Sequence, residues 1–124
     1  MNTTTLPARA DAPAPMSVFE RYLTVWVFLC IVVGIALGQA IAQALGNRAG
    51  IRRYADATVP LDDALVRAVV DVSGRPYLSY HVEIPKWQML GDYDVFLTPE
   101  FVRGLVLNAG LTVHVDLLRG DNPH

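Results

Sequence analysis

The sequence predicts an α+β fold, in which a partial two-layer domain of strands and helices follows one long apolar helix. One observation is that no charged residue lies between Arg21 and Arg48, so that an uncharged apolar run of helical length begins the structured part of the chain. A second observation is that short Val- and Leu-rich segments come after it, separated by Gly, Pro, Asp and Asn. Strands and helices packed in two layers make an α+β domain.

Composition limits the domain count and the classes of partner. The chain has 124 residues, which is enough for one domain. A formal net charge of −2 and thinly spread arginines exclude a basic surface, so we expect no nucleic-acid partner. Cys30 is the only cysteine, which excludes an internal disulfide and a zinc site built from cysteines.

The N-terminal 46 residues divide into two parts. Residues 1–15 are rich in Pro, Ala and Thr without apolar periodicity, and we interpret them as a disordered tail. Residues 16–46 are predicted to form an apolar helix that is retained, and residues 47–124 a single domain. A cleaved signal peptide is the weaker interpretation, because the apolar run is long for such a segment and acidic residues precede it.

The segment Leu23–Leu45 is a candidate transmembrane helix. It reaches the roughly 20 apolar residues that cross a bilayer, and Tyr22 and Trp26 suit an interfacial aromatic belt. The alternative is a core helix of a soluble domain, because Gln39 and Gln43 interrupt its second half. If it spans the inner membrane, the three arginines after it place the rest of the chain in the cytoplasm. They are Arg48, Arg52 and Arg53.

The remaining elements occur in order along the chain. Ala64–Val72 is predicted to be a strand because of its valines and the turn residues after it. Tyr77–Ile84 alternates as a half-buried strand does. Thr98 is a suitable N-cap, followed by a proline that fits the first helical turn, and that helix is expected to end near Asn108. Leu111–Leu118 is the last predicted strand.

Several motifs carry a resemblance to a known family. GIRRY, VPLD, DVSGRPYL and NAGLTVH occur in this order between residues 50 and 114. With them, residues from about 33 to 124 resemble imidazoleglycerol-phosphate dehydratase, truncated at both ends. Residues 16–39 instead resemble the first transmembrane helix of arsenite efflux permeases. The two resemblances overlap at VGIALGQ, residues 33–39, as expected after a recombination, or after a sequence assembly that joined two genes at similar coding sequence.

The dehydratase resemblance implies a lyase of histidine biosynthesis that uses Mn²⁺ bound by two His-His-x-x-Glu motifs. The positions that match the first motif are Val27, Phe28 and Ile31, which cannot bind a metal. In the second motif His124 matches the first histidine, and Glu100 matches a further ligand position in part. We therefore predict little or no dehydratase activity for this chain alone. The family also implies a homo-oligomer with sites between subunits.

The resemblance further implies a phosphorylated imidazole substrate. Arg53 and Arg75 match family arginines that contact it, and a guanidinium binds phosphate through its planar fork of donors. Without the resemblance, both would be interpreted as surface arginines. No catalytic residue is assigned, and His81 and His114 are interpreted as structural. A hypothesis of another class is a small single-pass membrane protein, or permease fragment, with a cytoplasmic domain that is not catalytic.

Overall fold

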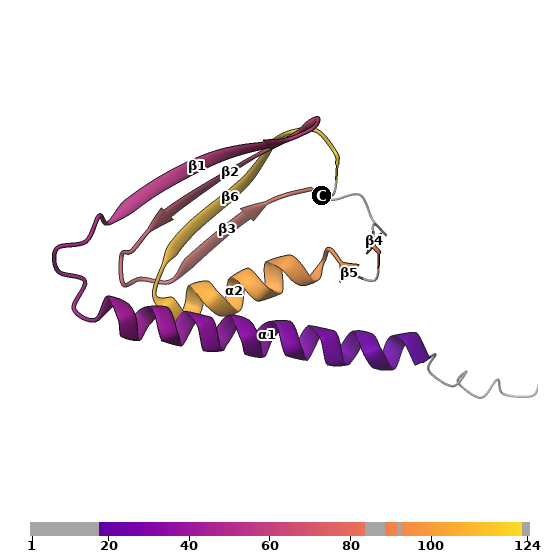
Figure 1. The fold of residues 1–124 in the computed structure, drawn as a ribbon, viewed down its shortest axis with the longest axis horizontal. Helices are drawn as coiled ribbons and strands as arrows, with labels where there is room; N and C mark the ends of the chain where they lie inside the picture. Colours follow the sequence, from indigo (N-terminus) through magenta and orange to yellow (C-terminus); the bar gives the residue numbers. More distant parts are fainter. Residues whose placement is uncertain (1–17, 84–88, 92, 123–124) are drawn as a thin grey trace, which may run out of the picture.

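A computed structural model describes residues 18–83, 89–91 and 93–122 (Figure 1). The predictions for the tail of residues 1–15 and for His124 lie outside these ranges. The elements are α1 (Val18–Leu45), β1 (Tyr54–Leu61), β2 (Ala64–Asp71), β3 (Tyr77–His81), β4 (Met89–Leu90), β5 (Tyr93–Asp94), α2 (Leu97–Ala109) and β6 (Thr112–Arg119).

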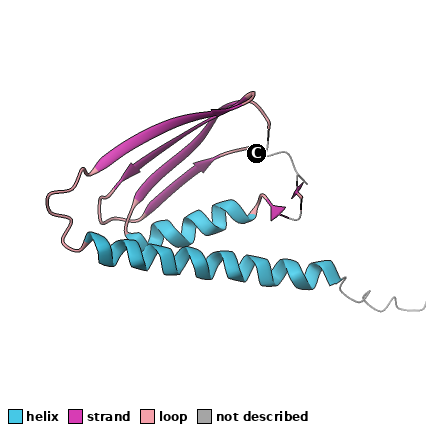
Figure 2. Cartoon of the chain, viewed as in Figure 1, coloured by secondary structure: helices cyan, strands magenta, loops and turns pink. Residues whose placement is uncertain are grey.

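The main sheet has the order β1-β2-β6-β3. β1 and β2 form an antiparallel hairpin whose turn is Asp62 and Asp63, and β2 is antiparallel to β6. β3 runs parallel to β6, because α2 carries the chain across the sheet between them. α2 lies against one face of the sheet, and α1 packs along α2 on the side away from the sheet (Figures 1 and 2).

The hydrophobic core lies between α2 and the sheet. Its buried members come from the end of α2 and the start of β6, and Ile41 of α1 packs against them. α2 ends at Gly110, which has a left-handed backbone (φ 66°) that glycine adopts without a steric cost. The buried members of this cluster are Val106, Ala109, Leu111 and Val113.

The two helices approach each other through three glycines. A Cβ atom on Gly34 would lie 2.5 Å from the carbonyl oxygen of Phe101, and one on Gly38 would lie 2.5 Å from that of Leu105. From the other side, a Cβ on Gly104 would lie 3.2 Å from the carbonyl oxygen of Ile31. The backbones of α1 and α2 are therefore in contact, and this contact leaves no room for side chains.

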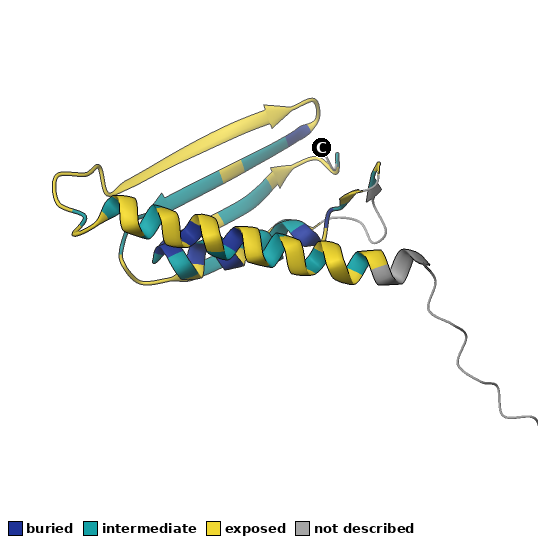
Figure 3. Cartoon of the chain, turned by 60° about the horizontal axis from the view of Figure 1, so that its bottom comes forward, coloured by how far each residue is buried: buried dark blue, intermediate teal, exposed yellow. Residues whose placement is uncertain are grey.

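Most of α1 away from α2 is exposed, although its side chains are apolar (Figure 3). Phe28 is 69% exposed, Val25 62% and Trp26 54%. β1 is exposed along its whole length, and it forms one edge of the sheet. The core is therefore covered, whereas the outer side of α1 and the whole of β1 are exposed.

The α+β fold class is confirmed, as are the helix over Leu23–Leu45 and the strands near Ala64–Val72 and Leu111–Leu118. β3 ends at His81, before the predicted end at Ile84. The prediction that Thr98 caps α2 is wrong. The N-cap is Phe96, which makes no side-chain capping bond, and the Thr98 hydroxyl is instead 2.9 Å from the hydroxyl of Tyr93. β1 was not predicted.

Candidate functional site

Arg53 and Asp71 form a two-bond ion pair where β1 begins and β2 ends. Arg53 Nε donates to Asp71 Oδ1 at 2.7 Å, and Nη2 donates to Oδ2 at 3.0 Å. The hairpin register pairs Tyr54 with Asp71, so the residue before β1 necessarily faces the end of β2. The backbone N–H of Val72 also donates to the Arg53 carbonyl at 2.8 Å. The planar guanidinium matches the carboxylate, as it would match a phosphate.

Arg75 lies in the loop between β2 and β3, and its backbone is held from two sides. The Ser73 hydroxyl accepts the Arg75 N–H at 3.1 Å, and Thr112 Oγ1 donates to the Arg75 carbonyl at 3.0 Å. The two hydroxyls are 2.9 Å apart. In addition, the Gly74 N–H donates to the Gly110 carbonyl at 2.9 Å. The loop is therefore fixed to the junction of α2 and β6, and Arg75 has a defined place.

The two predicted substrate arginines thus occur at the same end of the sheet, on either side of Asp71. They differ in whether their guanidinium donors already have partners. The donor fork of Arg53 is occupied by Asp71, whereas the Arg75 guanidinium makes no hydrogen bond or ion pair within the described ranges. Arg75 is also close enough to lower the pKa of Asp71 through its charge. An anion at this end would meet Arg75 directly and would compete with Asp71 for Arg53.

This ion pair shifts the pKa values of its members. The hydrogen bonds from Arg53 lower the pKa of Asp71 below its ordinary 3.8, and the bond to Asp71 raises the pKa of Arg53. In the turn of the hairpin, the pKa of Asp63 is lowered mainly because it accepts the backbone N–H of Asp121, 3.3 Å away. Both carboxylates are held in the ionised form by hydrogen bonds.

These shifts predict an acid-sensitive fold. A carboxyl whose pKa is lower in the folded state contributes stability above its unfolded pKa, and that contribution is lost as the pH falls through the folded pKa. We therefore expect the melting temperature to fall as the pH drops below about 4. Asp71→Asn should flatten the profile, as circular dichroism melts between pH 6 and 2 would show. An unchanged profile in this variant would contradict the role given to the ion pair.

Arg48 was noted in the sequence only as a charge after the apolar run, and its structural contacts were not predicted. It lies in the connection from α1 to β1 with a positive φ of 58°, and its Nη2 donates to the Ala109 carbonyl at 3.3 Å. Its Nε is buried without a partner among the described residues. Arg48 therefore ties the end of α1 to the end of α2. Asp71, Ser73 and Thr112 were missed as well, although all three lie inside the motifs DVSGRPYL and NAGLTVH.

Of the two metal-ligand candidates, Glu100 and His124, the structure describes Glu100. Glu100 lies in the first turn of α2, where its carboxylate is 3.8 Å from Arg103 Nε, and His124 lies outside the described residues. The first-motif positions Val27, Phe28 and Ile31 carry hydrocarbon side chains on α1. In the described part of the chain, no three His, Cys, Asp or Glu side chains are close enough to hold an ion. The hydrocarbon side chains at the first-motif positions have no lone pairs to offer Mn²⁺, which carboxylate oxygens suit.

The two histidines of the described strands lie on the sheet face away from α2. The His114 ring packs at 5.6 Å from that of Tyr77. His81 Nδ1 is 3.2 Å from Asp116 Oδ1 and 3.4 Å from Ser79 Oγ. A Ser-His-Asp relay needs the serine and the aspartate on different ring nitrogens. Both contacts here involve Nδ1, so this cluster is not a nucleophilic triad.

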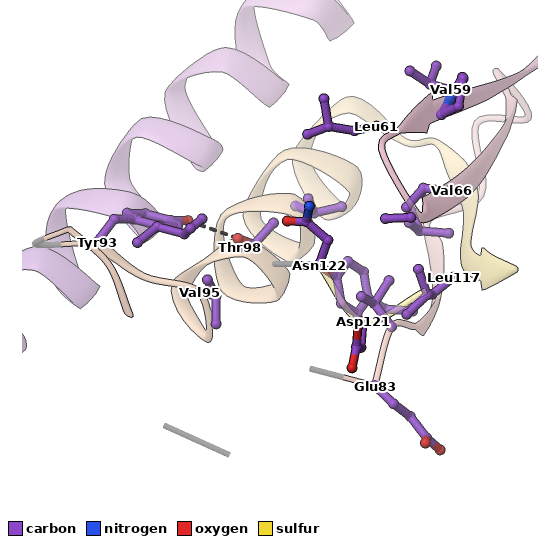
Figure 4. A pocket seen from close by; sticks show the side chains of 17 residues that line it. Val59, Leu61, Val66, Glu83, Tyr93, Val95, Thr98, Leu117, Asp121 and Asn122 are labelled. Carbon is purple, nitrogen blue, oxygen red and sulfur yellow. Dashed lines mark hydrogen bonds between the residues drawn. The ribbon is translucent and has the colours of Figure 1, made fainter. Parts of the chain in front are cut away.

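A groove of about 620 Å³ opens at the other end of the sheet, between the β1–β2 turn and the start of α2 (Figure 4). Its walls are mainly aliphatic, Asp121 and Asn122 add polar atoms to its lining, and Glu83 extends away from the other labelled side chains. It contains neither Arg53 nor Arg75. The predicted substrate arginines and this groove are therefore at opposite ends of the domain.

The model of the imidazoleglycerol-phosphate dehydratase family matches residues 28–124. The chain is 58% identical over 92 residues to the dehydratase of Bordetella avium, an alignment that covers 74% of this chain and 47% of that protein. It is 60% identical over 92 residues to that of Alkalilimnicola ehrlichii, covering 74% and 46%. The chain thus spans about half the length of the curated relatives it matches.

Solved structures agree with the sequence matches. The dehydratase from Staphylococcus aureus superposes with a TM-score of 0.75 at 40% identity, covering 79% of this chain and 57% of that chain. The dehydratase from Pyrococcus furiosus in complex with (S)-C348 superposes with a TM-score of 0.70 at 36% identity, covering 80% and 54%. The fold, the motifs and the family match agree, and the chain belongs to the imidazoleglycerol-phosphate dehydratase family.

Proposed function

We propose that this chain is a part of the dehydratase scaffold that keeps an anion-binding end and lacks a metal centre. Its family role is the dehydration step of histidine biosynthesis, and the ligand it retains is a phosphorylated imidazole compound held by Arg75 with Arg53. Turnover by this chain alone is little or none. The dehydratase-like part acts in the cytoplasm. Assembly into a homo-oligomer would bring the arginine end of the sheet in one copy next to the groove end of the sheet in another copy.

The observation that carries the proposal is the arrangement of Arg53, Arg75 and Asp71. Arg75 has a fixed backbone and a guanidinium without a partner in the described structure, so its donors are available to an anion. Arg53 already holds a carboxylate in the two-bond geometry that a phosphate would adopt. Asp71 therefore occupies the place of an anion and limits access to Arg53.

Phosphate binding is expected to depend on Arg75 more than on Arg53. Arg75→Gln should weaken the binding of inorganic phosphate and imidazole glycerol phosphate about tenfold or more, because a charge-assisted hydrogen bond is lost. Asp71→Asn should strengthen it, because a competing negative charge is removed. Calorimetric titration of the full chain measures the affinity for phosphate in each variant. Nuclear magnetic resonance shifts of the amides in the loop between β2 and β3 then show where phosphate binds.

The matched control is Arg67→Gln. Arg67 of β2 pairs with Asp56 of the edge strand β1 at 3.4 Å, so this variant makes the same change of charge away from the candidate site. It should bind phosphate as the unchanged chain does. Equal losses in the Arg67 and Arg75 variants would mean that phosphate responds to net charge alone, and the anion site would be abandoned.

The second candidate is a single-pass membrane protein with a domain that is not catalytic. The observation that favours it is the stretch Tyr22–Leu45 of α1, whose 24 residues are long and apolar enough to cross a membrane. Of its 18-residue apolar window, 11% is buried inside the structure. Its exposed side chains are apolar, and residues 16–39 resemble the first helix of arsenite efflux permeases. Complete release from membranes at high pH would rule this candidate out.

A further inference from the structure

We infer that a lipid bilayer and α2 are alternative partners of α1, so that α1 cannot span a membrane while it remains packed on α2. The inference rests on the second candidate function, because it requires that α1 can enter a membrane at all. Its basis is where α2 contacts α1 along the candidate span.

The contact with α2 falls in the middle of that span. The candidate span Tyr22–Leu45 has its midpoint at Val33 and Gly34. A Cβ on Gly34 would face the Phe101 carbonyl, and the backbone approach of the two helices also involves Ile31 and Gly38, while Ile41 packs against the core further along α1. If α1 crossed a bilayer with α2 still attached, the first half of α2 would lie near the bilayer midplane.

α2 is unsuited to that position. Glu100 and Arg103 flank Phe101 on its first turns and are 44% and 56% exposed in their side chains. Charged side chains at the bilayer centre are costly unless they face protein or water. The opposite face of α2 also packs on the core of the main sheet, whose edge strand β1 is uncovered. Open sheet edges do not occur in the hydrocarbon region of a membrane.

The part of α1 before the glycine contacts is too short to solve this conflict. The residues before the contact region, Tyr22–Cys30, form nine residues of helix, or about 14 Å. A bilayer core is roughly 30 Å thick. Insertion of the whole span therefore requires α1 to leave α2, which would uncover Gly104 and Leu105 on the side of α2 that α1 covers.

The test compares a variant that blocks packing with one that only adds apolar area. Gly34→Leu with Gly38→Leu places side chains where the α2 backbone lies, yet keeps α1 apolar. Ala36→Leu with Ala40→Leu adds leucines on the exposed side of α1 and is the control. Each full chain is synthesised with vesicles of phosphatidylethanolamine and phosphatidylglycerol. Flotation then separates vesicles from aggregates, and alkaline carbonate removes loosely bound protein.

We expect the glycine variant to raise the carbonate-resistant fraction about tenfold or more over the unchanged chain, and the control to raise it far less. Hydrogen exchange should show protected α2 amides in soluble molecules and unprotected ones in resistant molecules. Resistant molecules with protected α2 amides would overturn the inference while leaving the membrane candidate standing. An equal rise in the control would also overturn it. No resistant fraction for any variant would remove the membrane candidate, and the inference with it.

Discussion

Alanine at Gly34 or Gly38 is expected to lower the free energy of unfolding by about 3 kcal/mol or more. Glycine to alanine inside a helix ordinarily raises stability by roughly 0.5–1 kcal/mol. Here the added Cβ would lie 2.5 Å from a backbone oxygen of α2, which has no rotamer that moves it away. The helices must separate, and the core behind α2 loosens. Gly104→Ala should cost less, because its nearest atom would be 3.2 Å away.

Urea unfolding followed by circular dichroism measures these differences, and Gln39→Ala is the control. Gln39 lies beside Gly38 on the exposed side of α1, so its replacement should change the free energy of unfolding by less than about 0.5 kcal/mol. If both glycine variants were as stable as Gln39→Ala, the packing of α1 on α2 would not exist in solution.

Dehydratase turnover by the purified chain with added Mn²⁺ is expected to be at least about a thousandfold below that of an intact relative. Loss of groups that merely orient metal ligands costs about 10- to 100-fold, and here the ligands themselves are replaced. Val27, Phe28 and Ile31 offer no lone pairs, and Glu100 lies beside Arg103. Steady-state assays on imidazole glycerol phosphate measure the difference.

The dehydratase of Bordetella avium serves as the active reference, because it is 58% identical over the shared region. The same enzyme treated with a chelator sets the background. A second assay asks whether the chain supports growth of a bacterium that lacks its own dehydratase and receives no histidine. Turnover within tenfold of the reference, or growth without histidine, would show that a metal centre forms after all.

Local patterns in the sequence predicted the elements whose side chains follow a strong period or whose ends carry turn residues. α1, β2 and β6 are of this kind, since each is a long apolar or valine-rich run. The end of α2 was predictable from the Ala109-Gly110 pair, because glycine suits the left-handed position there. The arginines of the candidate site came from motif resemblance alone, as no period marks them.

Features that depend on contacts between distant segments could not be predicted in this way. β1 reads YADATVPL, has no buried face, and contains Pro60, which an edge strand tolerates. Its identity as a strand comes from pairing with β2. α2 begins at Leu97, before Thr98, so Thr98 is not the cap that local preference favoured, and its hydroxyl contacts that of Tyr93. Likewise, the Arg53–Asp71 ion pair depends on the register of the β1–β2 hairpin. The glycines of α1 are equally typical of helices packed in a membrane and in a soluble protein, so they did not predict the contact with α2.

The glycine contact also makes VGIALGQ a permissive junction for the exchange of sequence. Gly34 and Gly38 both lie within this heptapeptide, while Ile31 contributes a backbone oxygen to the contact with Gly104, an atom that every residue possesses. Helical segments of very different origin could therefore be joined ahead of Val33 without disturbing the closest approach to α2. A gene that acquires a new beginning at this point keeps the helix contact on which the rest of the domain folds.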